Sequence, residues 1–170
     1  MTSNVALELR DRLTVARSSV LDMRPEIEAG EPWPLSDNFG TEPEASWGPR
    51  ETLAHVQEML PFWLGEIERV IDGRTAGGQV SFGRVAADEI RLASIERDRT
   101  LPLRELFGRI DADVDRIAAR LGELEAGELE ARGEHPRLGS MTVAQIVARF
   151  VSGHLEEHAA QLREVTAGST

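Results

Sequence analysis

The chain of 170 residues contains no cysteine and no tyrosine, and only 5% of its residues are aromatic. Without cysteine the protein forms no disulfide bond. A thiolate that serves as a nucleophile or as a metal ligand must therefore come from another molecule. The absence of cysteine does not by itself indicate a compartment.

The sequence also has little positive charge. Its 30 acidic residues outnumber 19 basic ones, which gives a formal net charge of −11, and the basic residues form no cluster. Nucleic acids and anionic membrane surfaces select for basic patches, so both classes of partner are excluded. A small neutral or cationic ligand is compatible with this charge.

Long apolar runs are absent as well. The N-terminal segment is charged and amphipathic, without the continuous apolar stretch of a secretory signal, and no later run approaches the length that spans a membrane. We expect a soluble cytoplasmic protein with no membrane partner. At 41% hydrophobic residues, the chain fits one domain over residues 1–170 with a core of its own.

What is present is helical periodicity. Apolar residues recur at gaps of three and four from Ala6 to Met23 and again from Leu103 to Leu124, which predicts two amphipathic helices. Between them, residues 30–48 contain three prolines and three glycines and read as a long loop. The sequence therefore favours an all-α fold, a four-helix bundle with a long crossover and a short extra helix.

Proline and glycine mark the remaining boundaries. Pro49 predicts the start of a helix that runs toward Gly73, with a kink at Pro61. A glycine-rich connector at 73–83 is followed by a shorter helix over 81–97. After a polar loop at 127–140, the last helix begins near Met141 or Thr142 and continues to about residue 165. No strand-like alternation of useful length is visible.

Two histidines near the end of the chain suggest a metal site. His154 and His158 are four residues apart, so both rings lie on one face of the last helix. That face is otherwise apolar, where a polar ring needs a hydrogen-bond partner or a metal. The alternative is a pair of histidines satisfied within the core or at its rim, because this spacing also arises by chance.

A third histidine, His55, shares the inward face of its helix with Thr52 and Met59. Three imidazoles with an open fourth position, which would hold water, are a catalytic zinc arrangement, whereas a closed structural site uses four protein ligands. We expect zinc first and nickel next, with cobalt, iron and manganese still open because ligand type does not fix the metal.

Several other polar residues are candidates for supporting roles. Gln161 lies one turn beyond His158 and is a candidate to hydrogen-bond a ligand ring, although a polar residue at a helix end explains it equally well. Glu58, Glu66 and Glu157 are candidate bases or anchors, but each is more simply a solvated helix charge. His135 precedes Pro136 in the expected loop and is excluded from the metal set as structural or exposed.

Three segments resemble the DinB-like metalloprotein family, which is distinct from the similarly named DNA polymerase. They are Ser46-Trp-Gly-Pro-Arg-Glu-Thr-Leu-Ala-His55, Gly133-Glu-His-Pro-Arg-Leu-Gly-Ser-Met-Thr142 and Gly153-His-Leu-Glu-Glu-His-Ala-Ala-Gln161. The resemblance implies a four-helix bundle with a long crossover and metal ligands at His55, His154 and His158. Many relatives have an aspartate where this chain has Leu155.

The resemblance also implies classes of function. The broader superfamily includes bacillithiol- and mycothiol-dependent transferases and isomerases, so we expect an enzyme whose metal activates a low-molecular-weight thiol or water for attack on a small-molecule substrate. No catalytic residue can be assigned. A metal-containing binding or stress-response protein without turnover is the alternative, and a structural bundle with incidental histidines is a third. A homodimer is expected, although Trp33, Phe39 or Phe82 could equally cover their own core.

Overall fold

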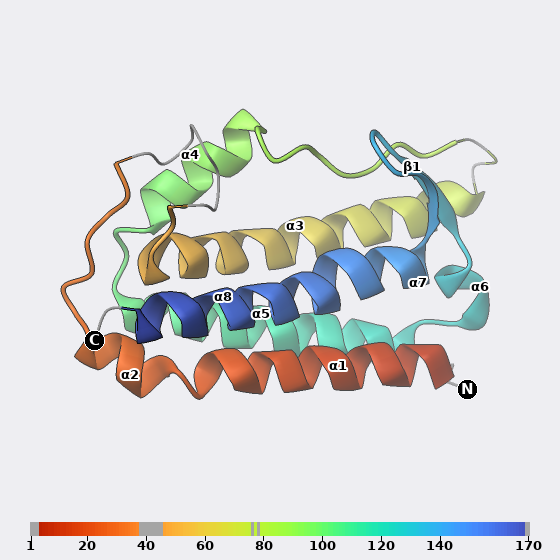
Figure 1. Ribbon diagram of the computed structural model, residues 1–170. Helices are drawn as coiled ribbons and strands as arrows, with labels where there is room; N and C mark the ends of the chain where they lie inside the picture. Colours follow the sequence, from red (N-terminus) through yellow and green to blue (C-terminus); the bar gives the residue numbers. More distant parts are fainter. Residues whose placement is uncertain (1–3, 38–45, 76, 78, 169–170) are drawn as a thin grey trace.

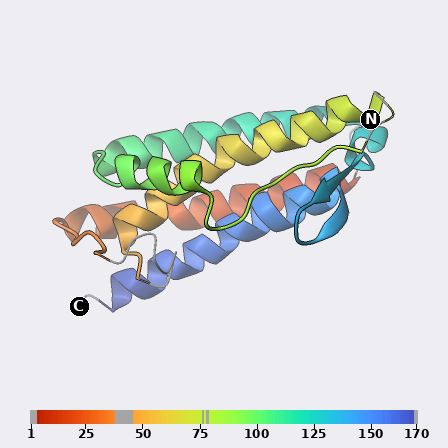
Figure 2. The same ribbon diagram turned by 90° about the horizontal axis from the view of Figure 1, so that it is seen from above.

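The computed structural model describes residues 4–37, 46–75, 77 and 79–168, so Phe39 lies outside the described residues. Four long helical rods form a bundle (Figures 1 and 2). Three are α1 (Asn4–Leu21), α3 (Pro49–Thr75) and α5 (Leu103–Glu123), and the fourth is the continuous series α7 (Val143–Ile146), η1 (Val147–Gly153) and α8 (His154–Ala167). The prediction of an all-α bundle is confirmed.

Each rod of the bundle packs against two neighbours. α1 packs against α5 and α8, and α3 packs against the same two helices. Figure 1 shows that α1 and α8 run in one direction while α3 and α5 run in the other. Because α3 and α5 are parallel, the chain between them must travel back along the whole bundle, which is the predicted long crossover.

Apolar stripes on the rods explain the packing. The predicted residues of α1 and α5 are buried in one core, and burial of a leucine, isoleucine or valine stabilises the fold by about 1.5–3 kcal/mol each. The buried residues of these two helices include Leu9, Leu13, Val20, Phe107, Ile110, Val114 and Leu121. Phe82 is also buried, at 1% exposure, and covers the core of its own chain.

Two predicted helix starts match the structure, and one short helix was not predicted. α3 begins at Pro49, and it remains helical through the exposed Pro61 to Thr75. The last rod begins after Thr142, whose side chain accepts a hydrogen bond from the backbone N–H of Gln145 while the Gln145 side chain accepts from that of Thr142. A short helix that was not expected, α2 (Arg24–Ala29), lies between α1 and the predicted loop at 30–48.

The crossover is more extended than the sequence suggested. The helix expected over 81–97 instead begins as α4 (Glu89–Asp98), where Asp88 caps the backbone N–H of Arg91. The preceding residues have other backbone partners: Phe82 donates to the carbonyl of Glu134, and Glu134 donates to the carbonyl of Val80. This pairing with a distant segment removes residues 80–82 from any helix.

That distant segment is a β-hairpin, where we expected a loop. β1 (Arg132–His135) pairs antiparallel with β2 (Gly139–Thr142), after a one-turn helix α6 (Ala126–Leu129). Each strand is four residues long, which is too short for alternation to be recognised in a sequence. No helix in the described part of the chain has both the length and the apolar character needed to cross a membrane.

Candidate metal centre

The structure brings the three predicted histidines together at the inner faces of α3 and α8. Nε2 of His154 lies 3.1 Å from Nε2 of His55 and 3.1 Å from Nε2 of His158. One potential ligand atom from each ring falls within 4.8 Å of the other two. His55 and His158 are buried, whereas the side chain of His154 keeps a quarter of its surface exposed.

Oxygen atoms on the opposite side of two rings favour a proton at that side. Nδ1 of His158 lies within hydrogen-bond distance of Oε1 of Gln161, at 2.8 Å, and Nδ1 of His154 has an ion-pair contact of 3.3 Å with a carboxylate oxygen of Glu157. When a neutral ring carries its proton on Nδ1, facing such an oxygen, its Nε2 has a lone pair. The Nε2 atoms of His154 and His158 are 3.1 Å apart, so two such lone pairs repel each other, and a bound cation would relieve this repulsion.

The donor set fits a transition metal. Nitrogen ligands that lie 2.0–2.1 Å from a tetrahedral ion are roughly 3.3 Å from one another, close to the spacing seen here. Metal-binding histidines also usually donate their second N–H to a carboxylate or carbonyl oxygen, and Gln161 and Glu157 place such oxygens beside Nδ1 of His158 and Nδ1 of His154. Nδ1 of His55 has no hydrogen-bond partner and lies 3.6 Å from Oε2 of Glu58, so a proton held there would point toward a carboxylate.

The surroundings keep two of the rings neutral. Burial, followed by the repulsion that a charged His55 would meet from His158 and Arg91, lowers the pKa of His55 well below its ordinary value of 6.5. The same causes, burial first, lower the pKa of His154 to about 3. Because metals bind the neutral imidazole, both shifts favour the ligand form at neutral pH.

A stretch of π-helix precedes the first ligand of α8. η1 spans Val147–Gly153, and His154 follows directly. Gly153 permits this wider turn, because a Cβ atom at this position would lie 2.7 Å from the carbonyl oxygen of Ala148. Such segments within α-helices occur frequently at functional sites. Leu155, by contrast, is fully buried in the core.

The supporting candidates divide into two groups. Gln161, Glu157 and Glu58 all lie beside a ring of the histidine trio, on the Nδ1 side. Glu66 has another role: its carboxylate accepts from the backbone N–H of Gly83 and pairs with Arg69, which ties the crossover to α3.

His135 is a buried structural residue, in agreement with its exclusion from the metal set. Its Nδ1 accepts hydrogen bonds from the backbone N–H groups of Arg137 and Leu138 and so closes the hairpin turn. Its ring stacks on Phe150, which stacks in turn on Trp63. Burial, with a smaller contribution from Arg149, lowers the pKa of His135.

A small cavity of about 180 Å³ opens beside the histidines. His55 and His154 contribute to its wall, and so do Arg84 and Arg91 from the crossover and α4. The sequence analysis missed both arginines, because nothing local in the sequence shows that the crossover returns to the histidines of other helices.

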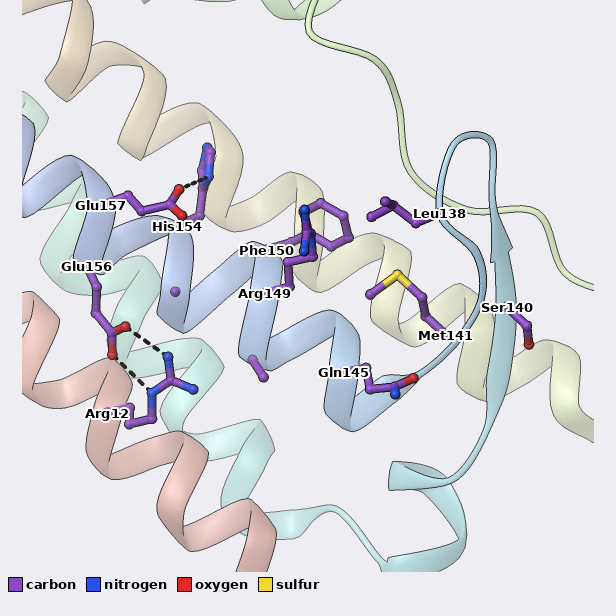
Figure 3. A pocket seen from close by; sticks show the side chains of 12 residues that line it. Arg12, Leu138, Ser140, Met141, Gln145, Arg149, Phe150, His154, Glu156 and Glu157 are labelled. Atoms are coloured by element: carbon purple, nitrogen blue, oxygen red, sulfur yellow. Dashed lines mark hydrogen bonds and ion pairs between the residues drawn. The ribbon is translucent and has the colours of Figure 1, made fainter.

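A larger groove of about 980 Å³ reaches the same centre from the side of the hairpin. Figure 3 shows His154 and Glu157 at one end of this groove and Leu138, Met141 and Ser140 at the other. Arg12 of α1 pairs there with Glu156 of α8, at 2.8 Å. His154 and Phe150 line both the groove and the small cavity, so the partly exposed His154 lies where the two meet.

Comparison with known proteins yields one match. The family model of the DinB superfamily matches residues 8–162, which include all three histidines. No curated protein and no solved structure matched the chain. The family match covers most of the sequence and includes every helix that supplies the histidine trio, so the chain belongs to the DinB superfamily.

Proposed function

We propose that this protein is a metal-dependent enzyme in which His55, His154 and His158 hold a divalent transition metal, zinc first and nickel next. The observation that carries the proposal is the proximity of the three rings, with Nε2 of His154 lying 3.1 Å from Nε2 of both His55 and His158. Membership of the DinB superfamily supports it.

The bound metal would act as a Lewis acid that lowers the pKa of a low-molecular-weight thiol or of water and makes it a nucleophile. The chain has no cysteine, so a thiol nucleophile would have to be a cosubstrate. The groove and the small cavity both reach His154, which gives separate approaches for a cosubstrate and a substrate. Gln161 and Glu157 lie on the Nδ1 side of the two rings of α8, which favours the tautomer that such a site needs.

A metal-containing binding protein without turnover is the second candidate. One observation favours it: among the described residues that line the small cavity, no carboxylate or hydroxyl side chain is present to serve as a general base. The groove does contain a carboxylate close to the histidines: Glu157 of α8 lies on its wall, 3.3 Å from Nδ1 of His154.

Elemental analysis tests the metal site. Protein purified without a polyhistidine tag should contain about one transition metal per chain, and His154→Ala should lose it. His135→Asn is the matched control, because it removes a buried histidine outside the trio and should retain the metal. A wild type that cannot be loaded with zinc or nickel, or a His154→Ala variant with unchanged metal content, would refute the site.

Activity assays then separate the candidate functions. The metal-loaded protein is incubated with a model electrophile, alone or with bacillithiol, mycothiol or glutathione. Turnover only with a thiol supports a transferase, turnover without thiol supports a hydrolase, and stoichiometric metal without turnover supports the binding protein. The proposal also includes a cytoplasmic location and a homodimeric state. Light scattering measures the oligomeric state of the purified protein.

A further inference from the structure

Glu58 of α3 contacts both a histidine of the candidate metal centre and the crossover. It is one turn beyond His55 on the same helix, and its Oε2 is 3.6 Å from Nδ1 of His55. The same carboxylate pairs through both of its oxygens with the guanidinium of Arg84, at 2.5 and 2.7 Å. The side chains of Glu58 and Arg84 are each only 10% exposed, so this ion pair is largely shielded from water. One carboxylate therefore joins the histidine cluster to the crossover.

Arg84 attaches the crossover to α3 at the wall of the small cavity. Its guanidinium lies 3.7 Å from the centre of the Phe62 ring, so it contacts a second side chain of the same helix. Three consecutive crossover residues line the cavity beside His55 and His154, namely Arg84, Val85 and Ala86. The shape of the cavity next to the histidines therefore depends on where Arg84 is held.

His55 presents a buried nitrogen atom to this carboxylate. Among the described residues, Nδ1 of His55 has no hydrogen-bond partner, and its distance of 3.6 Å from Oε2 of Glu58 is about 0.5 Å too long for a hydrogen bond. When Nε2 of a neutral imidazole binds a metal, the ring carries its proton on Nδ1. A buried N–H group needs an acceptor, and Glu58 places a carboxylate beside it. In the metal-bound protein, His55 would thus donate a charge-assisted hydrogen bond to the carboxylate that holds Arg84.

We propose that Glu58 is a positioning residue that couples metal binding at His55 to the attachment of the crossover through Arg84. With a metal at Nε2, the Nδ1 proton of His55 fixes the carboxylate of Glu58, and the fixed carboxylate holds Arg84 and the cavity wall in place. The cavity then takes its final shape only in the metal-bound protein. The inference rests on the proposed function, since it concerns the regulation of the same centre.

Hydrogen exchange followed by mass spectrometry, without zinc and at saturating zinc, tests the coupling in the full-length protein. In the wild type, zinc should slow exchange in peptides that span residues 80–88 by about fivefold or more, the lower end of a typical coupling between sites. In Glu58→Met, which lacks the carboxylate, zinc should leave the exchange of these peptides unchanged. The same variant should bind zinc about 10- to 100-fold more weakly in competition with a chromophoric chelator.

Glu66→Met is the matched control. Glu66 also ties the crossover to α3, but it does so by accepting from the backbone N–H of Gly83. Exchange in residues 80–88 should be faster in this variant, yet zinc should still slow it, and the zinc affinity should equal that of the wild type. Equal zinc affinities of Glu58→Met and Glu66→Met, or equal slowing by zinc in the two variants, would overturn the proposal.

A second variant serves if Glu58→Met does not fold. Arg84→Met leaves Glu58 and His55 in place, so it should still hold about one zinc per chain, but zinc should no longer slow exchange in residues 80–88. Persistent slowing in Arg84→Met would contradict the coupling. The zinc content of each sample separates two kinds of failure. A wild type that holds zinc without slower exchange in residues 80–88 refutes this inference alone, whereas a wild type that takes up no zinc refutes the proposed function as well.

Discussion

Gln161 is the residue through which the metal affinity can be tested without removing a ligand. Its Oε1 accepts from Nδ1 of His158, and partners of this kind orient the ring and raise its basicity. We predict that Gln161→Met lowers metal affinity by about 10- to 100-fold. Gln161→Glu should restore most of it, because a carboxylate also accepts from Nδ1. Competition with a chromophoric chelator measures the affinities.

The control for this prediction is Gln145→Met. Gln145 takes part in the cap of the last rod and lies outside the trio, so its loss should lower thermal stability and leave metal affinity unchanged. If Gln161→Met and Gln145→Met bind metal equally well, the side chain of Gln161 does not support His158.

At the level of residues, the sequence predicts the three clustered histidines but only part of their surroundings. His154, His158 and Gln161 are close in the chain, so helical geometry alone relates them, and His55 follows from its place on an inward face. Arg84 and Arg91 depend on the path of the crossover, which is determined by long-range contacts and has no local signal. A single sequence therefore predicts which residues form the trio and misses the cavity beside it.

The π-helical segment η1 is the element whose conformation we expect to matter most for the site. Gly153 is the position where a side chain would conflict with it, through the carbonyl of Ala148. We predict that Gly153→Ala lowers the free energy of unfolding by about 1–3 kcal/mol, the usual cost of a forced contact, and weakens metal binding by shifting His154. Urea titration and chelator competition measure the two effects.

Gly108 in α5 provides the matched control. It is an exposed helical glycine, and a Cβ atom at this position would contact nothing within 4 Å. Gly108→Ala should therefore stabilise the protein by about 0.4–1 kcal/mol, since alanine reduces the freedom of the unfolded chain. If Gly153→Ala is also stabilising, η1 relaxes to an α-helix without cost and has no role in placing His154.

The errors over the crossover and the hairpin have one physical cause. The helices α1, α3 and α5 are specified by local periodicity and by proline, and they were predicted close to their bounds. The hairpin and the extended part of the crossover stabilise each other through Glu134, whose backbone pairs with residues more than fifty positions earlier. Local patterns do not record such pairing, so a loop and a helix were predicted where the structure has strands and an extended chain.

On the scale of the whole molecule, the histidine cluster links folding to pH. The rings of His55 and His154 are buried and neutral in the fold, but they are readily protonated once the chain unfolds. The core thus holds these rings in the neutral form, which is the form that binds metal. Holding them neutral lowers the stability of the fold at acidic pH, and a bound metal ion would offset this loss. Metal at 100 times its dissociation constant would stabilise the fold by about 2.7 kcal/mol.

The metal-free protein should therefore lose stability as the pH falls below 6.5. His154 has an ordinary pKa of 6.5 in the unfolded chain and a pKa of about 3 in the fold, so between these values the unfolded state binds more protons. From pH 6.5 to pH 5 this residue alone removes about 1.6 kcal/mol. Burial also lowers the pKa of His55, so this residue contributes to the same loss of stability in acid. Urea titrations of chelator-treated wild type and His154→Gln at pH 7, 6 and 5 measure the effect, and the variant should show the shallower decline because its side chain does not titrate. Parallel declines in the two proteins would show that His154 is already protonated in the fold, and the neutral cluster would then be wrong.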